Sequence, residues 1–285
     1  MFLKLIPMKR ILIPTDFSHN AWNAIEYTLA FFDKIPVDIH LLHISYSGSV
    51  TDEANLHANG ISIIDNSQKK KVKQLKEIQH KIETLYPRST ANIEISAISS
   101  LFIEGIKNAV EENKIDLIVM GTKGASGLKE ATIGSHTGAV ITRVKCPILV
   151  IPERAVFQGP KNIVFPTDFN IIYKQKVLDT LLAVADLHKA SIKVLRVANN
   201  ELQLNEEQEK NRSFLHDALE GRSYSFHWVK NPKLEQGLQS FIDVMDIQIV
   251  AMVAKNLNFF QRLLFKPRVA RISYHTEIPF LVLHE

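Results

Sequence analysis

The sequence predicts an α/β protein made of two tandem doubly wound domains, each with a five-stranded parallel sheet. Three observations predict this class: an internal repeat, strand-like segments that alternate with helical ones, and continuous apolar runs in some of the strand-like segments. Of the 285 residues, 46% are hydrophobic and 22% are charged, which is typical of globular proteins with a core. We therefore expect two domains of ordinary size, at residues 1–155 and 156–285.

The internal repeat consists of four blocks that recur in the same order in both halves. The pairs, first half before second, are KRILIPTDFS (9–18) and KNIVFPTDFN (161–170), IHLLHI (39–44) and IKVLRV (192–197), IDLIVMGTK (115–123) and IQIVAMVAK (247–255), and CPILVIPE (146–153) and IPFLVLHE (278–285). Four matched blocks in one order indicate a duplication, and the join lies near residues 154–160.

The helices of the first half are predicted from the spacing of their apolar residues. At residues 18–32, Ser18 is a suitable N-cap, and it is followed by the regularly spaced apolar residues Ala21, Ile25, Leu29 and Phe32. Residues 66–86 have one apolar face, formed by Val72, Leu75, Ile78, Ile82 and Leu85. Two shorter helices are predicted at residues 101–112 and 134–144, and a loop is predicted at residues 45–64.

Strands are predicted between these helices, at residues 11–14, 37–44, 91–98, 115–120 and 147–151. Two continuous apolar runs, at residues 117–120 and 148–151, are typical of parallel strands buried on both faces. Right-handed crossovers then produce a doubly wound domain, which binds ligands at the carboxyl ends of the strands where the strand order reverses. The second half repeats this plan, with strands near residues 162–165, 191–197, 224–229, 247–253 and 279–283.

A glycine-rich segment follows the fourth predicted strand, with the pattern G-x2-G-x9-G-S. Its defined positions are Gly121, Gly124, Gly134 and Ser135. Glycines let the backbone approach phosphate groups closely, and the N-terminus of the helix that starts at Gly134 attracts a negative charge. The hydroxyls of Ser135 and Thr137 can add hydrogen bonds, and Lys123 can supply a positive charge to a terminal phosphate.

This pattern is neither a Walker loop, which needs Gly-Lys-Ser/Thr, nor the G-x-G-x-x-G fingerprint of dinucleotide sites. An ordinary strand-to-helix turn would explain one or two of its glycines. Three glycines and a helix-opening serine, placed after the strand where the fold predicts a ligand, favour phosphate binding.

The motifs of the first half resemble those of the universal stress protein family. They are PTDFS after the first strand, LLHI in the second strand, and IVMGTKG followed by IGSHT and CPILVIP. The resemblance covers the first half and, more weakly, the second. It implies an adenine nucleotide alpha hydrolase-like, Rossmann-like fold, and in this family the glycine pattern marks the members that bind ATP.

The resemblance also implies which residues hold the nucleotide. Asp16, with Pro14 and Thr15 beside it, would contact the adenine or its surroundings, and Ile44 would lie near the adenine. The residues implied to line the nucleotide or to hold its ribose and phosphates are Met120, Gly121, Gly124, Gly134, Ser135, His136 and Thr137. For His136 the resemblance requires only the backbone N–H.

Structural interpretations of some of these residues remain open. Asp16 is also suited to cap the helix that follows it, and its counterpart Asp168 persists in the second half, where the glycine loop is lost. Core packing alone would explain Met120, and His43 is more typical of a core histidine than of a ligand. The lysine cluster at residues 69–76 is typical of the solvated face of an amphipathic helix.

The second half lacks the glycine pattern. Ungapped alignment places Val253 opposite Gly121, Asn256 opposite Gly124, and Lys266 and Pro267 opposite Gly134 and Ser135. A β-branched valine and a proline, which has no N–H, are poor at holding a phosphate. The apolar segment 257–265 is more typical of a packing surface. We expect one nucleotide site per chain and a structural or regulatory second half; a different ligand there is the alternative.

These features together predict an ATP-binding regulator or sensor of stress responses, with or without Mg²⁺. We favour this class over an enzyme because the glycine loop contains no aspartate and the chain has no H-E-x-x-H, C-x-x-C or G-x-S-x-G motif. A slow ATPase or nucleotidyl-transfer enzyme is one alternative, and it would need a metal-binding carboxylate near Gly134. A non-binding interaction scaffold is the other.

Composition also predicts the setting in which the protein works. A net charge of +4 without a basic stripe argues against nucleic-acid binding, and no apolar run is long enough to span a membrane. The single cysteine, Cys146, precedes a strand and is predicted to be a buried thiol in a cytoplasmic protein. The matching last strands, 147–151 and 279–283, predict an intrachain pseudo-dimer; a homodimer and unidentified protein partners are further possibilities.

Overall fold

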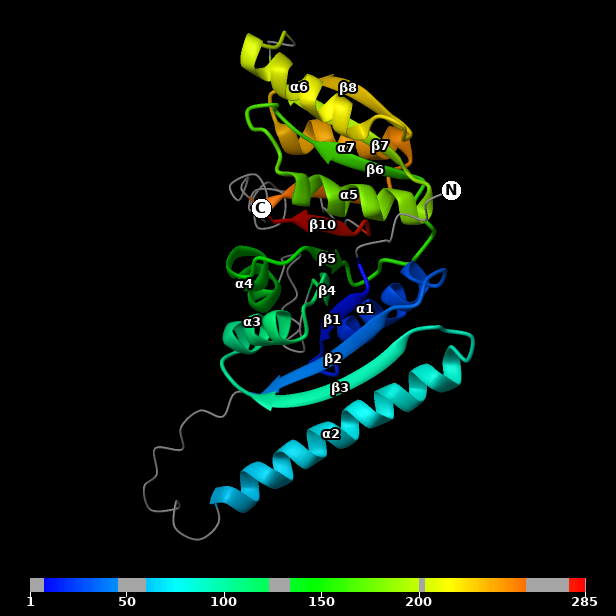
Figure 1. The fold of residues 1–285 in the computed structure, drawn as a ribbon, viewed down its shortest axis with the longest axis vertical. Coiled ribbons are helices and arrows are strands. Elements are labelled where there is room, and N and C mark those ends of the chain that lie inside the picture. The colour runs from blue at the N-terminus through cyan, green and yellow to red at the C-terminus, as the bar shows by residue number, and fades with distance from the viewer. Residues whose placement is uncertain (1–7, 46–59, 123–133, 200–202, 255–276, 285) are drawn as a thin grey trace.

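The computed structural model describes residues 8–45, 60–122, 134–199, 203–254 and 277–284, without the side chains of residues 60–67. Its strands form one ten-stranded sheet in the order β3-β2-β1-β4-β5-β10-β9-β6-β7-β8 (Figure 1). The strands are β1 (Arg10–Pro14), β2 (Asp38–Ser45), β3 (Asn92–Ser99), β4 (Leu117–Gly121), β5 (Ile148–Ile151), β6 (Asn162–Pro166), β7 (Ser191–Ala198), β8 (Tyr224–Lys230), β9 (Ile249–Val253) and β10 (Phe280–Leu283). The helices are α1 (His19–Phe31), α2 (Gly60–Leu85), α3 (Phe102–Glu112), α4 (Ser135–Arg143), α5 (Gln175–His188), α6 (Glu206–Leu219) and α7 (Leu234–Met245).

Read outward from the centre, the strand order is β5-β4-β1-β2-β3 on one side and β10-β9-β6-β7-β8 on the other, so matching strands of the two halves occupy matching places. Strands β1 to β5 pair with one another in parallel, and so do strands β6 to β10. The two five-stranded parts meet where β5 and β10 pair antiparallel, with Leu281 opposite Leu149. The predicted parallel sheets are therefore confirmed, and the predicted pairing of the two last strands joins them into one continuous sheet.

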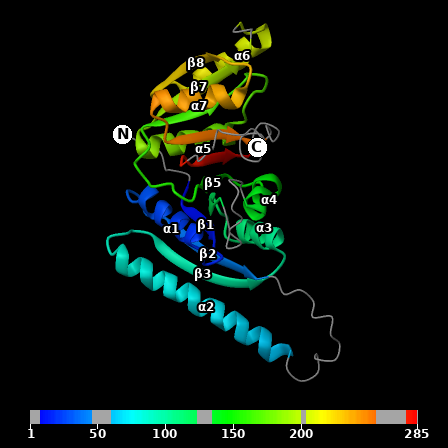
Figure 2. The same cartoon turned by 180° about the vertical axis from the view of Figure 1, so that it is seen from behind.

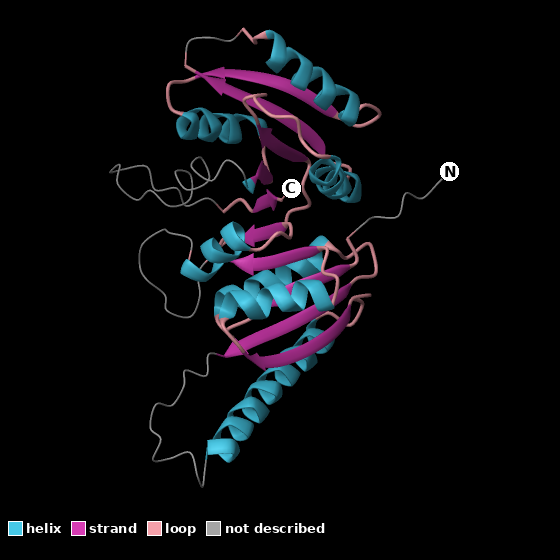
Figure 3. Cartoon of the chain, turned by 60° about the vertical axis from the view of Figure 1, so that its left-hand side comes forward, coloured by secondary structure: helices cyan, strands magenta, loops and turns pink. Residues whose placement is uncertain are grey.

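Helices cover both faces of this sheet, as the doubly wound class requires (Figure 3). On one face α1, α2, α5 and α6 pack on a core that includes Ile13, Phe165 and Leu281. On the other face α3, α4 and α7 pack on a core that includes Leu12, Val164 and Val282. Because neighbouring residues of one strand enter opposite cores, strands covered on both faces, such as β5, β9 and β10, must be apolar throughout, which is the pattern seen in the sequence.

The two outermost strands each lie beside a helix, α2 beside β3 and α6 beside β8, at opposite ends of the molecule (Figure 2). Helix α2 begins at Gly60, within the segment predicted as a loop. Its inner face is formed as predicted by Leu75 and Ile82, but Leu85 is 53% exposed. Tyr86 packs on the core instead and donates a hydrogen bond from its hydroxyl to Glu26 Oε1 at 3.0 Å, so the prediction for Leu85 was wrong.

Two smaller findings bear on the predicted setting. None of the helices in the described part of the chain combines the length and apolar character that a membrane span requires. Cys146 is buried, and burial raises the pKa of its thiol to about 12, which confirms the prediction of a structural thiol.

Candidate functional site

The first half places its candidate site where the strand order reverses. Strand β1 lies between β2 and β4, and the three run parallel, so their carboxyl ends meet at one edge of the sheet. Pro14 ends β1 and Gly121 ends β4. Doubly wound folds bind ligands at such a switch point, because the connections leave the strands toward opposite faces and open a crevice between them.

The turn after β1 is held by its own side chains. The Thr15 N–H donates to the Leu42 carbonyl at 2.8 Å, and the Thr15 hydroxyl accepts from the Phe17 N–H at 3.1 Å. Asp16 is exposed, and its Oδ1 accepts from the Ser18 N–H at 3.0 Å. Phe17 has a φ of 67°, a left-handed conformation that these bonds stabilise.

Ser18, and not Asp16, is the N-cap of α1. Its hydroxyl accepts from the Ala21 N–H at 3.2 Å, as predicted for a helix that starts after Ser18. Asp16 stabilises the turn one step earlier, by fixing the backbone of the capping residue. The proposed capping role of Asp16 is therefore replaced by a related structural one, which still leaves its side chain at the surface of the site.

The second half repeats this turn, and hydrogen bonds from nearby side chains hold it. Phe169 has a φ of 60°, and Asp168 Oδ1 accepts from the Asn170 N–H at 3.0 Å. The Asn170 side-chain amide donates to Asp168 Oδ2 at 2.8 Å, and Gln208 Nε2 on α6 donates to the Asp168 carbonyl at 2.9 Å. Both carboxylate oxygens of Asp168 thus accept hydrogen bonds within the turn.

Gly121 is required by packing at the end of β4. A Cβ on Gly121 would lie 2.9 Å from the carbonyl oxygen of Asn20, in the first turn of α1. In the second half the corresponding helix starts later: α1 begins three residues after Asp16, whereas α5 begins seven residues after Asp168. Val253 ends β9 as Gly121 ends β4, and its side chain is buried. The second half accommodates this side chain because its described part has no helical turn at the position where Asn20 approaches Gly121.

Two hydrogen bonds tie the start of α4 and its N-cap Gly134 to the end of β4 and the residue that follows it. The Gly134 N–H donates to the Thr122 carbonyl at 2.5 Å, and the Thr137 hydroxyl donates to the Gly121 carbonyl at 2.8 Å. Thr137 is only 3% exposed, whereas Ser135 and His136 are exposed. The first N–H groups of a helix have no acceptor within it, so α4 presents backbone donors at this edge of the sheet.

Ile44 and Met120 lie on the same face of the sheet as α3 and α4. Met120 is 6% exposed and belongs to the core, which supports the packing interpretation of this residue. Ile44 is half-buried at the carboxyl end of β2 and packs against that core. The His136 ring stacks on Phe102 of α3, with 4.2 Å between ring centroids. Lys123 and Gly124 lie outside the described residues.

On the opposite face of β2, His43 is a core histidine, as predicted. It is 8% exposed, its Nδ1 is 2.8 Å from the Thr15 carbonyl, and its ring packs on Phe17. Burial lowers the pKa of His43; the hydrogen bond to Thr15 raises it, the nearby Lys71 lowers it and Asp16 raises it.

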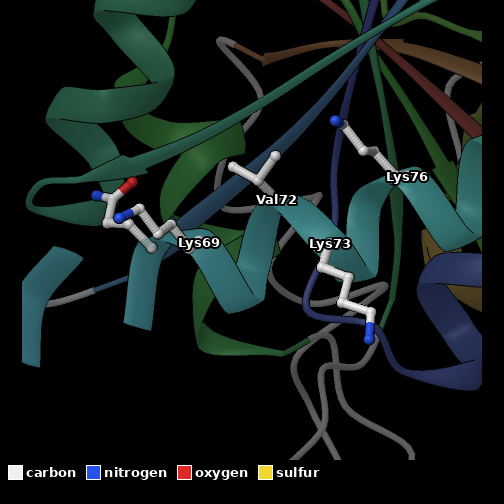
Figure 4. Close-up of a pocket in the computed structure, with 5 residues that line it drawn as sticks. Lys69, Val72, Lys73 and Lys76 are labelled. Carbon is white, nitrogen blue, oxygen red and sulfur yellow. The ribbon is translucent and has the colours of Figure 1, made fainter. Parts of the chain in front are cut away.

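Lys71 is a site neighbour that sequence reasoning missed. Its ammonium lies 5.0 Å from the centroid of the Phe17 ring, and the side chain is half-buried. Lys71 is four residues before Leu75 on the inner face of α2, and this spacing would have separated it from the rest of the lysine cluster. Lys69, Lys73 and Lys76 are exposed and, with Gln68 and Val72, line a pocket on α2, so the solvated-face interpretation holds for these three (Figure 4).

Metal-ligating groups do not gather in the described ranges: no three His, Cys, Asp or Glu side chains there are close enough to hold an ion. An anion is instead favoured by the exposed amino end of α4. This end is linked to the start of α1 through Gly121, which packs against Asn20 and accepts the hydrogen bond from Thr137. The arrangement can therefore bind a negatively charged group, and its chemistry fits a phosphate.

Comparison with known proteins identifies the family. The sequence profile described as the Universal stress protein family matches residues 7–152, just over half of the chain. The chain belongs to this family. This universal stress protein is 29% identical to Universal stress protein MJ0577 of Methanocaldococcus jannaschii over 161 residues, which are 51% of this chain and 96% of that protein. It is 23% identical to Universal stress protein YxiE of Bacillus subtilis over 159 residues, which are 50% and 97% of the two chains.

The fold of the whole universal stress protein chain also has a solved counterpart. A crystal structure of a universal stress protein from Archaeoglobus fulgidus matches it with a TM-score of 0.66 and 18% identity, over 96% of this chain and 98% of that chain. At this identity the likeness shows the fold alone. It extends over both halves, including the second half, which the family profile does not match.

Proposed function

We propose that this universal stress protein binds ATP at a single site in its first half and acts as a regulator or sensor of stress responses. The observation that carries the proposal is the amino end of α4. Its first residues, Ser135 and His136, are exposed, and Thr137 ties this end of the helix to Gly121 at the switch point of the sheet. This is the position at which the glycine pattern of the sequence predicts the phosphates.

The residues of the first half have separate roles in this proposal. The N–H groups of Ser135, His136 and Thr137 bind the phosphates, assisted by Lys123 and Gly124 from the loop. Pro14, Thr15 and Asp16 lie at the adenine side together with Ile44, while Met120 and Gly121 form the floor between the two groups. In this proposal ATP binds with or without Mg²⁺. The hydrogen bond between the Thr137 hydroxyl and Gly121 indicates that this side chain mainly orients α4.

The second half, residues 156–285, is proposed to be a degenerate copy that binds no ATP. Its turn already provides hydrogen bonds to both carboxylate oxygens of Asp168. In the proposal, Asp16 lies at the adenine side of the nucleotide. A ligand that contacted the Asp168 carboxylate in the same way would have to displace the Asn170 side chain. We place the protein in the cytoplasm, where it acts through protein partners. The chain itself works as an intrachain pseudo-dimer or as a homodimer of two chains.

The proposal is tested by calorimetric titration of nucleotide-stripped protein with ATP and Mg²⁺. A Ser135→Pro variant removes one N–H donor, yet proline is favoured at the first position of a helix. The preceding Gly134 has a ψ of 149°, which suits a residue before proline. We expect one site per chain and a loss of at least about tenfold in affinity for this variant. Ser135→Ala, which removes only the hydroxyl, is the matched control.

Other outcomes would change the proposal in defined ways. Two sites per chain would show that the second half is competent. Equal binding by the proline variant would place the phosphates away from α4. No binding by folded wild-type protein would refute ATP sensing and favour the interaction scaffold. Phosphate release measured in the same samples would show whether the protein is instead a slow ATPase.

A further inference from the structure

Helices α3 and α7 share a glycine at the fourth position, Gly105 and Gly237. Each donates its N–H to the first carbonyl of its helix, from Gly105 to Leu101 at 2.9 Å and from Gly237 to Lys233 at 3.0 Å. Glycine is the poorest helix former after proline, so its presence at the same interior position in both halves requires a packing reason.

The packing reason is the close approach of each helix to a strand end. A Cβ on Gly105 would lie 2.9 Å from Ile44 Cδ1 and 3.1 Å from Ile98 Cδ1. A Cβ on Gly237 would lie 2.5 Å from Val197 Cγ1. Ile44 and Val197 occupy matching positions, because Leu42 and Leu195 before them accept the equivalent N–H groups of Thr15 and Thr167.

Ile44 lies at the carboxyl end of β2, next to β1 at the switch point. We propose that Gly105 is a positioning residue of the nucleotide site: its missing side chain leaves room for Ile44 Cδ1 and so sets where Ile44 meets the adenine. This inference rests on the proposed function. The contact that alanine would create involves the end of a flexible side chain, so Ile44 is the group that moves, while the strand and helix keep their places.

The chain offers a rescue variant that addresses the nearest contacting atom. Ile44→Val removes Cδ1, the atom that would lie closest to a Cβ at residue 105, and leaves the rest of the side chain in place. Val197 shows that valine is accommodated at this strand position in the second half. Gly237→Ala is the matched control, because it introduces a still tighter contact, 2.5 Å against 2.9 Å, in the half that is proposed not to bind ATP.

The experiment measures ATP and adenosine affinity by calorimetry and the unfolding midpoint by circular dichroism. We expect Gly105→Ala to weaken both ligands about tenfold. We expect Gly105→Ala/Ile44→Val to bind within about threefold of Ile44→Val alone, and Gly237→Ala to lower the midpoint without changing affinity. Adenosine is included because it lacks phosphates, and its affinity therefore reports the base side of the site.

Each contrary result has a distinct meaning. Unchanged affinity of a folded Gly105→Ala variant would overturn the inference and leave the proposed function intact. A failure of Ile44→Val to rescue affinity would show that Gly105 acts on the helix and not on Ile44. If Gly105→Ala does not fold alone, the double variant is compared with Ile44→Val, and weaker binding by the double variant overturns the inference. If wild-type protein binds no nucleotide, the proposed function and the inference both fail.

Discussion

The hydrogen bond from the Thr137 hydroxyl to the Gly121 carbonyl gives the sharpest test of how this site is built. The bond is 2.8 Å long and joins the first turn of α4 to the last residue of β4. Thr137→Val replaces the hydroxyl with a methyl group of similar size, so the change removes the donor with little change of volume. The Gly121 carbonyl then loses a partner in a region where Thr137 is only 3% exposed.

The expected cost follows from this burial. Leaving a buried acceptor without its donor costs about 1–3 kcal/mol; because Gly121 is half-buried, we expect the free energy of unfolding of the first half to fall by about 1 kcal/mol. Thr142→Val is the control on the same helix. The Thr142 hydroxyl donates within α4, to the Gly138 carbonyl at 3.0 Å, and the residue is exposed. Its loss should change stability by less than about 0.5 kcal/mol.

The assay uses the placement of the two tryptophans in the chain. Trp22 lies on α1 in the first half and Trp228 on β8 in the second half. In a Trp228→Phe background, the fluorescence of Trp22 during urea unfolding reports the first half, which avoids assuming that the two halves unfold together. ATP affinity is measured on the same proteins.

One result would refute this reasoning. If Thr137→Val leaves the stability of the ligand-free protein unchanged but removes ATP binding, the hydroxyl is a phosphate ligand and not a tie between α4 and β4. Loss of stability with a smaller loss of affinity is the result that the structure predicts. Thr137→Ser, which keeps the hydroxyl, should then restore most of the stability.

Three further perturbations have defined outcomes. Gly121→Ala should destabilise the first half by about 1–3 kcal/mol in urea unfolding, because its Cβ would meet the Asn20 carbonyl; unchanged stability would show that α1 yields freely. His188 is packed between two aromatic rings, and burial, with a smaller effect of Lys34, lowers its pKa from 6.5 to about 4. As the pH drops, the unfolded state therefore takes up this proton first, so the free energy of unfolding should fall between about pH 6.5 and 4. His188→Phe should remove about 2 kcal/mol of that loss, after allowing for solvent screening. An unchanged pH dependence of the unfolding midpoint in this variant would contradict the assignment. Lys71→Met should raise the pKa of His43 in an NMR titration, because Lys71 lowers it in the wild type, and a fall would show that the lysine acts through packing.

The sequence by itself determined the fold class, the repeat and the order of the elements. These properties depend on local signals: apolar runs mark buried strands, spacing of three and four marks helices, and Ser18 marks the start of α1. The matching last strands also predicted the pairing of β5 with β10, since each half ends in the same apolar strand. The fold class together with the glycine pattern also predicts a ligand site near Gly121 and Gly134, and this site stays a prediction.

Only the tertiary structure decided how distant residues meet within this framework. Three contacts of this kind join segments that are separated in the chain. They are the antiparallel pairing of β5 with β10, the hydrogen bond from Thr137 to Gly121, and the packing of Lys71 over the Phe17 ring. Sequence periodicity identifies the face on which a side chain lies but not the partner it meets there. The sequence predicts Gly121 as part of the phosphate-binding pattern. It does not reveal that Gly121 also packs against Asn20, because that contact depends on how α1 lies against β4.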